Sequence, residues 1–469
     1  MEHRRTVDSG VGAARPRNVC VVGAGYVGLT AAACLAELGH TVRCVESDPV
    51  RLASLLGGHV PIHEPGLDEL VSAHAATGRL SFTDDIYEAT RDTGVALLCV
   101  GTPPRPDGEP DLRQLGRAAI EVATQASEDM VLVVKSTVPP GTCEALELLA
   151  SGHARPGVRV NVASNPEFLR ESEAVWDFFN PDRVVVVVDV LELEETVVSL
   201  YPSQWPMLVC DRRSAELVKY AANTFLALKI SFANEVAALC EALGAESHNV
   251  LAGIGLDTRI GGAFLSPGPG FGGSCLPKDL SGFIAVAASV GQRTPIAEAA
   301  QLVNDGAIAS LIKKLEVALG PLDGKRISVL GIAFKPGTSD VRFSPGLALI
   351  DELVARGATV RAHDPLARHS SPTFEQVDDP YRAAAGADAL VVVTAWAQYR
   401  TLSPQLVRKA MAGHAVIDAV HALDLRDYHD AGFDIYGVGR GLATSFAPVL
   451  SSPLEWMLES ESVEDLVAP

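Results

Sequence analysis

Short valine-rich runs alternate with longer stretches of helical spacing in this chain, and the alternation occurs twice. The first spans residues 18 to 188 and contains the runs NVCVVGAG, TVRCVES, VALLCVG, MVLVVKS, VRVNVASN and RVVVVVD. The second spans residues 325 to 420 and contains KRISVLGIAF, TVRAHDP, ALVVVTAW and HAVIDAV. Strands that alternate with helices form parallel sheets with helices on both faces. We therefore predict an α/β chain with two Rossmann-like, doubly wound parallel-sheet domains.

The segment between the two alternations is expected to be helical. Residues 213–245 carry apolar residues at helical spacing, with no proline and no glycine before Gly244, which predicts one long central helix. At 469 residues the chain can give several domains a core each. The expected organisation is a disordered tail (1–17), a first Rossmann domain (18–210), a helical middle (211–320), a second α/β domain (321–440) and an acidic tail (441–469).

Charge and hydropathy argue against two classes of partner. The net charge of -20 disfavours nucleic acid, whose phosphates are bound by clustered lysine and arginine. No apolar run is long enough to cross a bilayer, and residues 1–17 lack the apolar core of a secretory signal. The eight cysteines are scattered, without a CxxC pair or a His/Cys cluster, so we expect buried thiols in a reducing cytoplasm and no metal.

A glycine motif follows the first predicted strand. Gly23, Gly25 and Gly28 stand between VCVV and the helical stretch LTAAACLAELG, which is the context of a dinucleotide-binding turn. The glycines let the backbone approach a pyrophosphate, and the helix N-terminus supplies amide donors. Glu46 closes the second strand about 20 residues later, where a carboxylate accepts from ribose hydroxyls and repels a 2′-phosphate. NAD is therefore expected rather than NADP, while FAD would share the fingerprint.

A second candidate site is the segment GGSCLPKD, which places Cys275 after two glycines and before Lys278 and Asp279. A nearby ammonium favours the thiolate form that a nucleophile requires. From these residues alone, a buried cysteine in a glycine turn is an equally good interpretation.

From residue 18 to about 438 the sequence resembles the UDP-glucose/GDP-mannose dehydrogenase family. The matching blocks are VVGAGYVGL, PIHEPGLDELV, CVGTPP, VVKSTVPPGT, SNPEFLRE, ELVKYAANTFLALKISFANE, GLDTRIG, GFGGSCLPKD and AFKPGTSDVRFSP. The resemblance implies an NAD-binding first domain, a second domain that binds the nucleotide sugar, and a four-electron oxidation of the hexose C6 hydroxyl to a carboxylate.

The family chemistry implies roles for particular side chains. Cys275 would attack the C6 aldehyde to give a thiohemiacetal, which a second hydride transfer converts to a thioester that water hydrolyses. Lys219 and Asn223, four residues apart on one helix face, would steady the C6 oxygen as negative charge develops. Asp279 would be the acid/base partner of the cysteine, and Thr137 would hold a water beside it.

Two glutamates of the block NPEFLRE lie four residues apart. Glu167 matches a residue proposed to assist thioester hydrolysis in the family, since a carboxylate near the thioester can activate water. Glu171 is read either as a ligand contact or as a surface helix charge. Arg259 matches an arginine that reaches into the sugar site of a neighbouring subunit, so the resemblance implies a homodimer.

The binding residues implied by the resemblance form two sets. The set for the cofactor is Gly23, Gly25, Tyr26, Val27, Gly28, Glu46, Arg51, Thr102, Pro103, Ser136, Thr137, Glu171, Lys278 and Arg342. The set for the sugar nucleotide is Glu167, Phe168, Leu169, Lys219, Asn223, Arg259, Phe264, Phe271, Gly272 and Lys335.

The resemblance is weakest near the end of the second sheet. Relatives usually carry Asp-Gly-Arg-Asn there, with an arginine that helps to hold the nucleotide, whereas this chain has Asp418, Ala419, Val420 and His421. The sugar-site blocks favour UDP-glucose, with dTDP-glucose and GDP-mannose as alternatives. A single-step hydroxy-acid dehydrogenase would have no use for Cys275 or for a second α/β domain. A non-enzymatic sensor would not be expected to retain the chemical residues.

Overall fold

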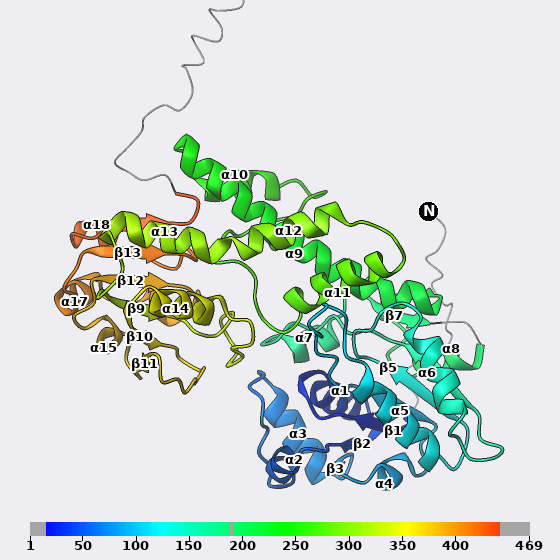
Figure 1. Cartoon of the computed structure of the whole chain (residues 1–469). Helices are drawn as coiled ribbons and strands as arrows, with labels where there is room; N and C mark the ends of the chain where they lie inside the picture. The colour runs from blue at the N-terminus through cyan, green and yellow to red at the C-terminus, as the bar shows by residue number, and fades with distance from the viewer. Residues whose placement is uncertain (1–15, 188–190, 441–469) are drawn as a thin grey trace, which may run out of the picture. The chain divides into compact units, whose positions relative to one another are not determined.

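The computed structural model describes residues 16–187 and 191–440, so the predicted tails lie almost wholly outside the described residues. The chain divides into two units (Figure 1). The first contains the residues up to 225 together with 278–294, and the second contains 226–277 together with the residues from 295 onward.

The first unit is built on a six-stranded parallel sheet of order β3-β2-β1-β4-β5-β6. The strands are β1 (Asn18–Val22), β2 (Thr41–Val45), β3 (Leu80–Thr83), β4 (Val95–Leu98), β5 (Met130–Val134) and β6 (Val160–Ser164). Val22 is in register with Val45 on one side and with Leu98 on the other. The strand order reverses between β1 and β4, where a doubly wound sheet opens a crevice at the carboxyl ends of its strands. The predicted Rossmann fold is confirmed.

Helices cover both faces of this sheet because the inward side chains of each strand alternate between two apolar clusters. Val19 and Val21 pack toward α1 (Tyr26–Glu37), α3 (Leu67–Ala76) and α7 (Ala174–Phe179). Cys20 and Val22 pack toward α5 (Arg113–Gln125) and α6 (Thr142–Ser151), beside α4 (Ile86–Thr90). The short helix α2 (Pro49–Leu56) follows β2 and begins at Asp48, whose carboxylate accepts from two amides of its first turn.

Residues 184–187 of the predicted valine-rich strand lie outside the main sheet. Strand β7 (Val184–Val187) pairs in parallel with β8 (Met207–Cys210) in a separate two-stranded sheet, and α8 (Leu191–Val198) lies between them in the chain. The six-stranded sheet instead gains β3, whose sequence LSFT was not among the predicted strands.

The predicted long helix is confirmed as α9 (Arg212–Leu243). It ends before Gly244, whose φ of +71° is the left-handed conformation that closes many helices. The other helices of the middle segment are α10 (Ser247–Gly255), α11 (Leu276–Ser289), α12 (Pro295–Asp305) and α13 (Ala307–Leu319).

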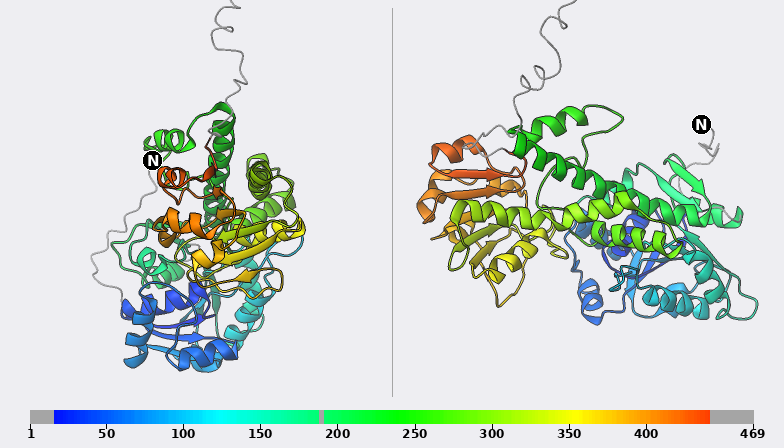
Figure 2. Two further views of the ribbon diagram at one scale, coloured as in Figure 1. Left: turned by 90° about the vertical axis from the view of Figure 1, so that its left-hand side faces the viewer. Right: turned by 45° about the horizontal axis from the view of Figure 1, so that its top comes forward.

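The second unit contains another six-stranded parallel sheet, of order β11-β10-β9-β12-β13-β14 (Figure 2). Its strands are β9 (Arg326–Leu330), β10 (Thr359–His363), β11 (Glu375–Gln376), β12 (Ala389–Val392), β13 (Ala415–Asp418) and β14 (Asp434–Gly437). Its remaining helices are α14 (Pro345–Ala355), α15 (Pro380–Ala384), α16 (Ala397–Arg400), α17 (Pro404–Ala410) and α18 (Leu425–Asp430). The two edge strands β11 and β14 are short and were not predicted.

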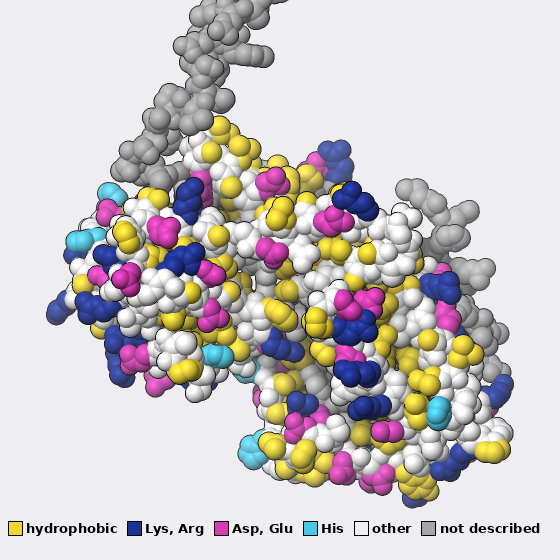
Figure 3. Space-filling view, viewed as in Figure 1, with side chains coloured by type: hydrophobic (Ala, Val, Ile, Leu, Met, Phe, Trp, Pro, Cys, Tyr) yellow, Lys and Arg dark blue, Asp and Glu magenta, His cyan; other side chains and the backbone are white. Residues whose placement is uncertain are grey.

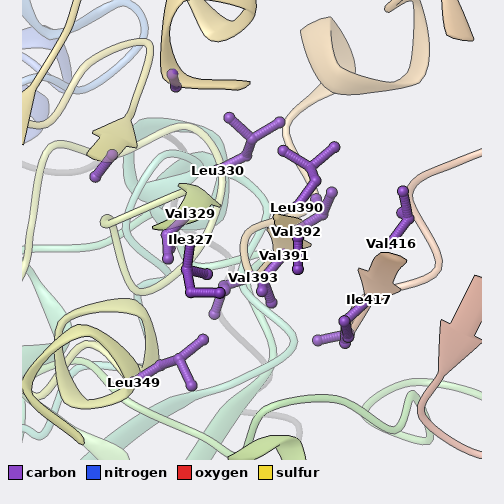
Figure 4. Packing of buried hydrophobic residues seen from close by; sticks show 14 of the residues in the cluster. Ile327, Val329, Leu330, Leu349, Leu390, Val391, Val392, Val393, Val416 and Ile417 are labelled. Atoms are coloured by element: carbon purple, nitrogen blue, oxygen red, sulfur yellow. The ribbon is translucent and has the colours of Figure 1, made fainter. Parts of the chain in front are cut away.

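The core of the second sheet is formed by aliphatic residues of its central strands. Ile327 and Val329 of β9 lie beside Val391 of β12 and Ile417 of β13, and Leu349 of α14 covers them (Figure 4). Each such side chain contributes about 1.5–3 kcal/mol on full burial. The second predicted α/β domain is therefore confirmed as a fold with its own core.

Two observations concern nucleic acid and membranes, the partners that the sequence disfavours. Lysine and arginine side chains are interspersed with acidic ones on the face drawn in Figure 3. Among the described residues, no helix is long and apolar enough to span a membrane.

Candidate active site

The glycine turn after β1 is shaped by close backbone contacts. Gly23 has a φ of +101°, and a Cβ there would lie 3.0 Å from the carbonyl oxygen of Cys99. A Cβ on Gly28 would lie 1.8 Å from the carbonyl oxygen of Gly23, so α1 packs on the turn only because residue 28 is glycine. At Gly25 a Cβ would meet nothing within 4 Å. The cradle therefore fits a pyrophosphate approaching the first turn of α1.

Glu46 follows β2 and is buried beside a cation. Its Oε2 lies 2.9 Å from Nη1 of Arg51, and its Oε1 accepts from the amide of Asp48 at 2.8 Å. The structure thus brings together two of the predicted cofactor residues, Glu46 and Arg51. A carboxylate at this position is an acceptor for ribose hydroxyls, while Arg51 is a nearby cation that would meet a phosphate if Glu46 were absent.

Three predicted residues meet at the carboxyl ends of β4 and β5. Thr102 Oγ1 donates to the carbonyl oxygen of Thr137 at 3.0 Å, and Ser136 Oγ donates to that of Val100 at 2.6 Å. Pro103 follows on the exposed side of the same loop. These contacts tie the two loops that flank the crevice beside β1.

Tyr26 links the glycine turn to the loop that follows β6. Its hydroxyl accepts from the amide of Ser172 at 2.8 Å, and the buried carboxylate of Glu64 accepts from the same amide at 2.8 Å. Ser172 has a φ of +69°, a strained conformation that these two acceptors hold in place. Glu171 directly precedes Ser172 in the chain, and Val27 follows Tyr26 in the first turn of α1.

Lys219 and Glu167 form a buried ion pair. Nζ of Lys219 lies 3.0 Å from Oε1 of Glu167, and the two side chains are only 5% and 8% exposed. Oε2 of Glu167 accepts from the amide of Leu169 at 2.6 Å. Nζ of Lys219 also lies 5.3 Å from the centroid of the Phe168 ring. Four predicted substrate residues therefore converge at this point.

Asn223 lies one turn after Lys219 on α9 and is bonded to a second carboxylate. Its Nδ2 donates to Oδ2 of Asp279 at 2.6 Å, and Oδ1 of Asp279 pairs with Nζ of Lys278 at 2.6 Å. Asp279 is 1% exposed. The two groups, on successive turns of α9, together contain two cations, two carboxylates and one amide, so donors and acceptors are present for an oxygen whose charge changes.

Cys275 directly precedes α11 and belongs to the second unit. It is the exposed member of the eight cysteines, none of which is in a disulfide. Its loop is packed against the second unit: a Cβ on Gly272 would lie 2.2 Å from the carbonyl oxygen of Phe343, and one on Gly273 would lie 2.6 Å from the ring of Phe334. Phe271 donates its amide to Oδ1 of Asn304 at 2.7 Å. The loop is thus fixed while its thiol reaches the surface.

Four other predicted ligand residues of the second unit range from half-buried to exposed. Arg259 pairs with Asp257 at 2.6 Å while its side chain remains 87% exposed, and Arg342 pairs with Asp340 at 2.6 Å. Lys335 lies with its Nζ 5.9 Å from the centroid of the Phe334 ring. Phe264 has a φ of +64°, a conformation rare for an aromatic residue. The contacts described for the two arginines and for Lys335 are with near neighbours in the chain.

The segment that departs from the family pattern follows β13. The buried carboxylate of Asp418 accepts from the amides of Ala422 and Leu423, at 3.0 and 2.9 Å. His421 has a φ of +54°, and its Nε2 lies 2.6 Å from the carbonyl oxygen of Val438. The imidazole is therefore engaged with the chain itself.

Sequence reasoning missed two cations near the cluster. Lys135 is 5% exposed and hydrogen bonds to Asn165 and Tyr201. The guanidinium of Arg183 lies 3.7 Å from the centroid of the Phe168 ring, and burial lowers its pKa. A lysine directly after an apolar strand was a visible signal for the first, whereas nothing in the sequence pairs Arg183 with Phe168.

Three features define the class of protein. They are a glycine cradle with an acidic residue after β2, the buried side chains of Lys219 and Asn223, and a second Rossmann-like sheet. Together they are typical of NAD-dependent dehydrogenases with two nucleotide-binding folds. The chain belongs to the UDP-glucose/GDP-mannose dehydrogenase family. The family's NAD binding domain matches residues 17–204, its central domain matches 213–306 and its UDP binding domain matches 328–425. The chain is thus an NAD-dependent nucleotide-sugar dehydrogenase, and its cofactor is NAD.

Individual relatives cover nearly the whole chain. The UDP-glucose 6-dehydrogenase of Rhizobium meliloti (strain 1021) is 41% identical over 434 residues, covering 90% of this chain and 99% of the relative. That of Pseudomonas aeruginosa is 41% identical over 440 residues, covering 90% and 97%. The solved UDP-glucose dehydrogenase of Pyrobaculum islandicum has a TM-score of 0.86 at 39% identity, covering 91% of this chain and 99% of the other.

Proposed function

We propose that this chain oxidises C6 of UDP-glucose to a carboxylate with two molecules of NAD, as a UDP-glucose 6-dehydrogenase. The observation that carries the proposal is the buried cluster in which Lys219 pairs with Glu167 and Asn223 bonds to Asp279. The names of the 41% identical relatives support the substrate. The roles of individual residues, and the three-domain division at 18–210, 211–320 and 321–440, are part of the proposal.

The chain's own residues hold the cofactor in a defined way. The first turn of α1 would hold the pyrophosphate and Glu46 would accept from the ribose hydroxyls, while the loops tied by Thr102 and Ser136 lie at the carboxyl ends of β4 and β5. When bound, NAD accepts the two electrons of each oxidation step as a hydride.

Lys219 and Asn223 act on the C6 oxygen in the first oxidation. An ammonium and an amide on one helix face donate to this oxygen as its proton leaves and negative charge develops. Both side chains are nearly dry, so their donor groups interact more strongly than they would in water. The product of this step is the C6 aldehyde, whose carbon is electrophilic.

Cys275 supplies the sulfur for the second oxidation. Its thiolate adds to C6 to give a thiohemiacetal, and loss of a second hydride and of the hydroxyl proton gives a thioester. Water then forms a C–O bond as the C–S bond breaks, which releases the carboxylate and returns the thiolate. Asp279 accepts and returns protons at the sulfur and C6 oxygen, Thr137 orients a water, and Glu167 takes the proton of the attacking water.

We infer that the chain acts as a homodimer. Phe225, Phe232 and Leu239 recur every seven residues on α9 and are 60%, 47% and 58% exposed, which supports an apolar helical contact with a second copy. The exposed Arg259 is the side chain expected to approach the neighbouring sugar site. The scattered cysteines, none of which is in a disulfide, support a reducing compartment, the cytoplasm.

The decisive experiment mixes the purified chain with NAD and a nucleotide sugar and measures NADH by absorbance and product by mass spectrometry. UDP-glucose should yield two NADH per sugar and UDP-glucuronate, while Cys275→Ala should form no uronic acid. One NADH per sugar, or full turnover by the alanine variant, contradicts the covalent route. The same assay with dTDP-glucose and GDP-mannose tests the alternative substrates, and light scattering of Phe232→Glu tests the dimer.

A further inference from the structure

Lys135 is a buried cation that the proposed chemistry does not use. It follows β5 directly and is 5% exposed. Its Nζ donates to the carbonyl oxygen of Asn165 at 3.1 Å, to Oδ1 of Asn165 at 2.9 Å and to the hydroxyl of Tyr201 at 3.3 Å. An ammonium has three protons, and these three acceptors account for all of them.

The three acceptors of Lys135 are neutral. Within residues 16–187 and 191–440, no carboxylate lies at ion-pair distance from its Nζ. Removing an ammonium from water is costly, and an apolar side chain of similar length would fill the space without that cost. A charge kept here without an anionic partner therefore indicates a requirement for donors at this position rather than for packing.

The residue that Lys135 holds leads directly into the acid of the active-site cluster. Asn165 is also fixed by its amide to Val134, at 2.9 Å, and by its Nδ2 to the carbonyl oxygen of Val185, at 2.7 Å. Only Pro166 separates it from Glu167 in the chain. The charges of both Lys135 and Glu167 act on the thiol of Cys99, so they lie in the same neighbourhood.

Tyr201 completes the arrangement around Asn165. Its hydroxyl donates to Oδ1 of Asn165 at 2.5 Å, and its ring packs near Phe178 and Trp205. Asn165 Oδ1 therefore receives two donors, one from Lys135 and one from a tyrosine anchored in an aromatic cluster. The loop that starts at Asn165 is fixed on both sides before it reaches Glu167.

We propose that Lys135 is a positioning residue that, through Asn165, sets the Glu167 carboxylate for hydrolysis of the Cys275 thioester. The inference rests on the proposed function. In that step the water oxygen bonds to C6, the C–S bond breaks, the thiolate of Cys275 leaves, and Glu167 accepts the proton of the water. Lys135 touches none of the reacting atoms and acts only by orienting the loop.

The test is Lys135→Met in the full-length protein, followed by stopped-flow and by intact mass during turnover with UDP-glucose and NAD. Misplacing Glu167 should slow hydrolysis about 100-fold and leave both oxidations within about threefold of the parent rate. The expected signature is a burst of two NADH per site, slow turnover after it, and a uronyl adduct on Cys275. A generally damaged fold would instead lower burst and turnover together.

Matched variants separate the explanations. Lys135→Arg should restore most of the turnover. Tyr201→Phe should give the same burst with a smaller loss of turnover rate. If Lys135→Met does not fold, the Tyr201→Phe result alone tests the positioning role. Arg213→Gln, which removes an exposed arginine paired with Glu144, should leave the kinetics unchanged.

Two outcomes would overturn the inference. In the first, Glu167→Gln shows a burst but neither Lys135→Met nor Tyr201→Phe does. This result would exclude the positioning role of Lys135 and leave the proposed function intact. Absence of both burst and adduct in Glu167→Gln itself removes the role assigned to Glu167. Failure of the parent protein to yield two NADH per UDP-glucose would be a separate failure, that of the proposed function.

Discussion

The two six-stranded sheets have the same strand order and the same first turn. Strands β1 and β9 occupy the same place in their sheets, and each is followed by a glycine with a left-handed φ. The φ is +101° at Gly23 and +104° at Gly331. Each glycine donates its amide to the end of the neighbouring strand, at 2.9 Å to Val45 and 2.8 Å to His363. Each turn also packs tightly against a glycine of the helix that follows it in the fold. The topology of the two nucleotide-binding folds is thus repeated in detail.

The turn after β1 and the turn after β9 differ in the groups that accept hydrogen bonds from their backbone amides. Gly25, the N-cap residue of α1, offers no side-chain cap, whereas the hydroxyl of Ser344, the N-cap residue of α14, accepts from two amides of the first turn. In the second sheet the carboxylate of Asp364 accepts from the amides of Ile332 and Ala333, both at 2.9 Å. A side chain of the protein therefore satisfies these amide donors of the second turn. Equal topology therefore does not give equal ligand sites.

The cysteines provide the largest contrast between the sheets. The first sheet and its turn hold Cys20, Cys44 and Cys99, whereas residues 295–469 contain no cysteine. Burial raises the pKa of Cys20 and of Cys99 to about 12. At pH 8 their thiolate fraction is therefore about 1,000-fold below that of an ordinary thiol. Iodoacetamide at pH 7 to 9 should label Cys275 in the folded protein and leave the sheet thiols unmodified, as peptide mass mapping would show.

The sign of the pH effect follows from the raised pKa. Burial favours the neutral thiol, so its contribution to the stability of the first unit is complete below the unfolded pKa of about 8.5 and is lost as the pH rises toward 12. Labelling of Cys20 should stay flat with pH until the unit unfolds. Native labelling of Cys20 at the rate of Cys275 would contradict its burial.

Asp364→Ala should have the largest effect on stability. The substitution leaves three buried backbone amides, the partly buried amide of Leu366 and the indole Nε1 of Trp396 without their acceptor. The expected loss is about 3–5 kcal/mol in the unfolding free energy of the second unit. Urea unfolding followed by tryptophan fluorescence measures it, with Asp364→Asn as the control that retains one oxygen. A loss below about 1 kcal/mol would show that the second turn does not depend on this carboxylate.

The two turns also differ in how well they could be predicted from the sequence. The first turn was predictable because three glycines, a preceding strand and a following helix lie within a short segment. The role of Asp364 was not, because its amide partners lie about 30 residues away in the chain. For the same reason the run at 183–189 identified a strand but not its partner β8.

In the candidate site, too, features set by local spacing were predictable and features set by contacts between distant residues were not. Lys219 and Asn223 could be placed on one helix face from their spacing, and the structure gives each a carboxylate partner. Which carboxylate each one meets depended on the packing of α9 against distant segments. Lys135 was overlooked because its acceptors, Asn165 and Tyr201, lie 30 and 66 residues away.

Gly28→Ala should break the first turn selectively. The new Cβ would lie 1.8 Å from the carbonyl oxygen of Gly23, so α1 must shift away from the turn at a cost of about 1–3 kcal/mol. We expect NAD affinity, measured by calorimetry, to fall at least tenfold together with thermal stability. Gly25→Ala is the matched control, because its Cβ enters open space and should weaken NAD without changing stability. Equal stability losses in both variants would refute the contact argument.

Glu46→Ala should change cofactor choice more than stability. The carboxylate accepts from ribose hydroxyls and repels a 2′-phosphate, and its removal also frees the guanidinium of Arg51. We expect NAD affinity to fall about tenfold, by the loss of one charge-assisted contact, and discrimination against NADP to relax. In the double variant Glu46→Ala/Arg51→Ala the gain toward NADP should disappear. An unchanged NAD:NADP ratio of kcat/KM in the single variant would exclude this role for Glu46.

Val420→Arg should have the smallest effect and tests the ligand site of the second sheet. Val420 follows β13 and is half-buried, with its Cγ1 3.9 Å from where a Cβ on Gly268 would lie. The adjacent His421 is engaged with Val438, so this segment offers no side-chain cation to a nucleotide. An added guanidinium should supply one further contact, raising kcat/KM for UDP-glucose about threefold to tenfold over dTDP-glucose. The measurement compares UDP-glucose, dTDP-glucose and GDP-mannose on the parent and the variant. Because the first turn is untouched, NAD affinity should stay constant, and a parallel change in NAD binding would show that the arginine disturbs the fold rather than nucleotide choice.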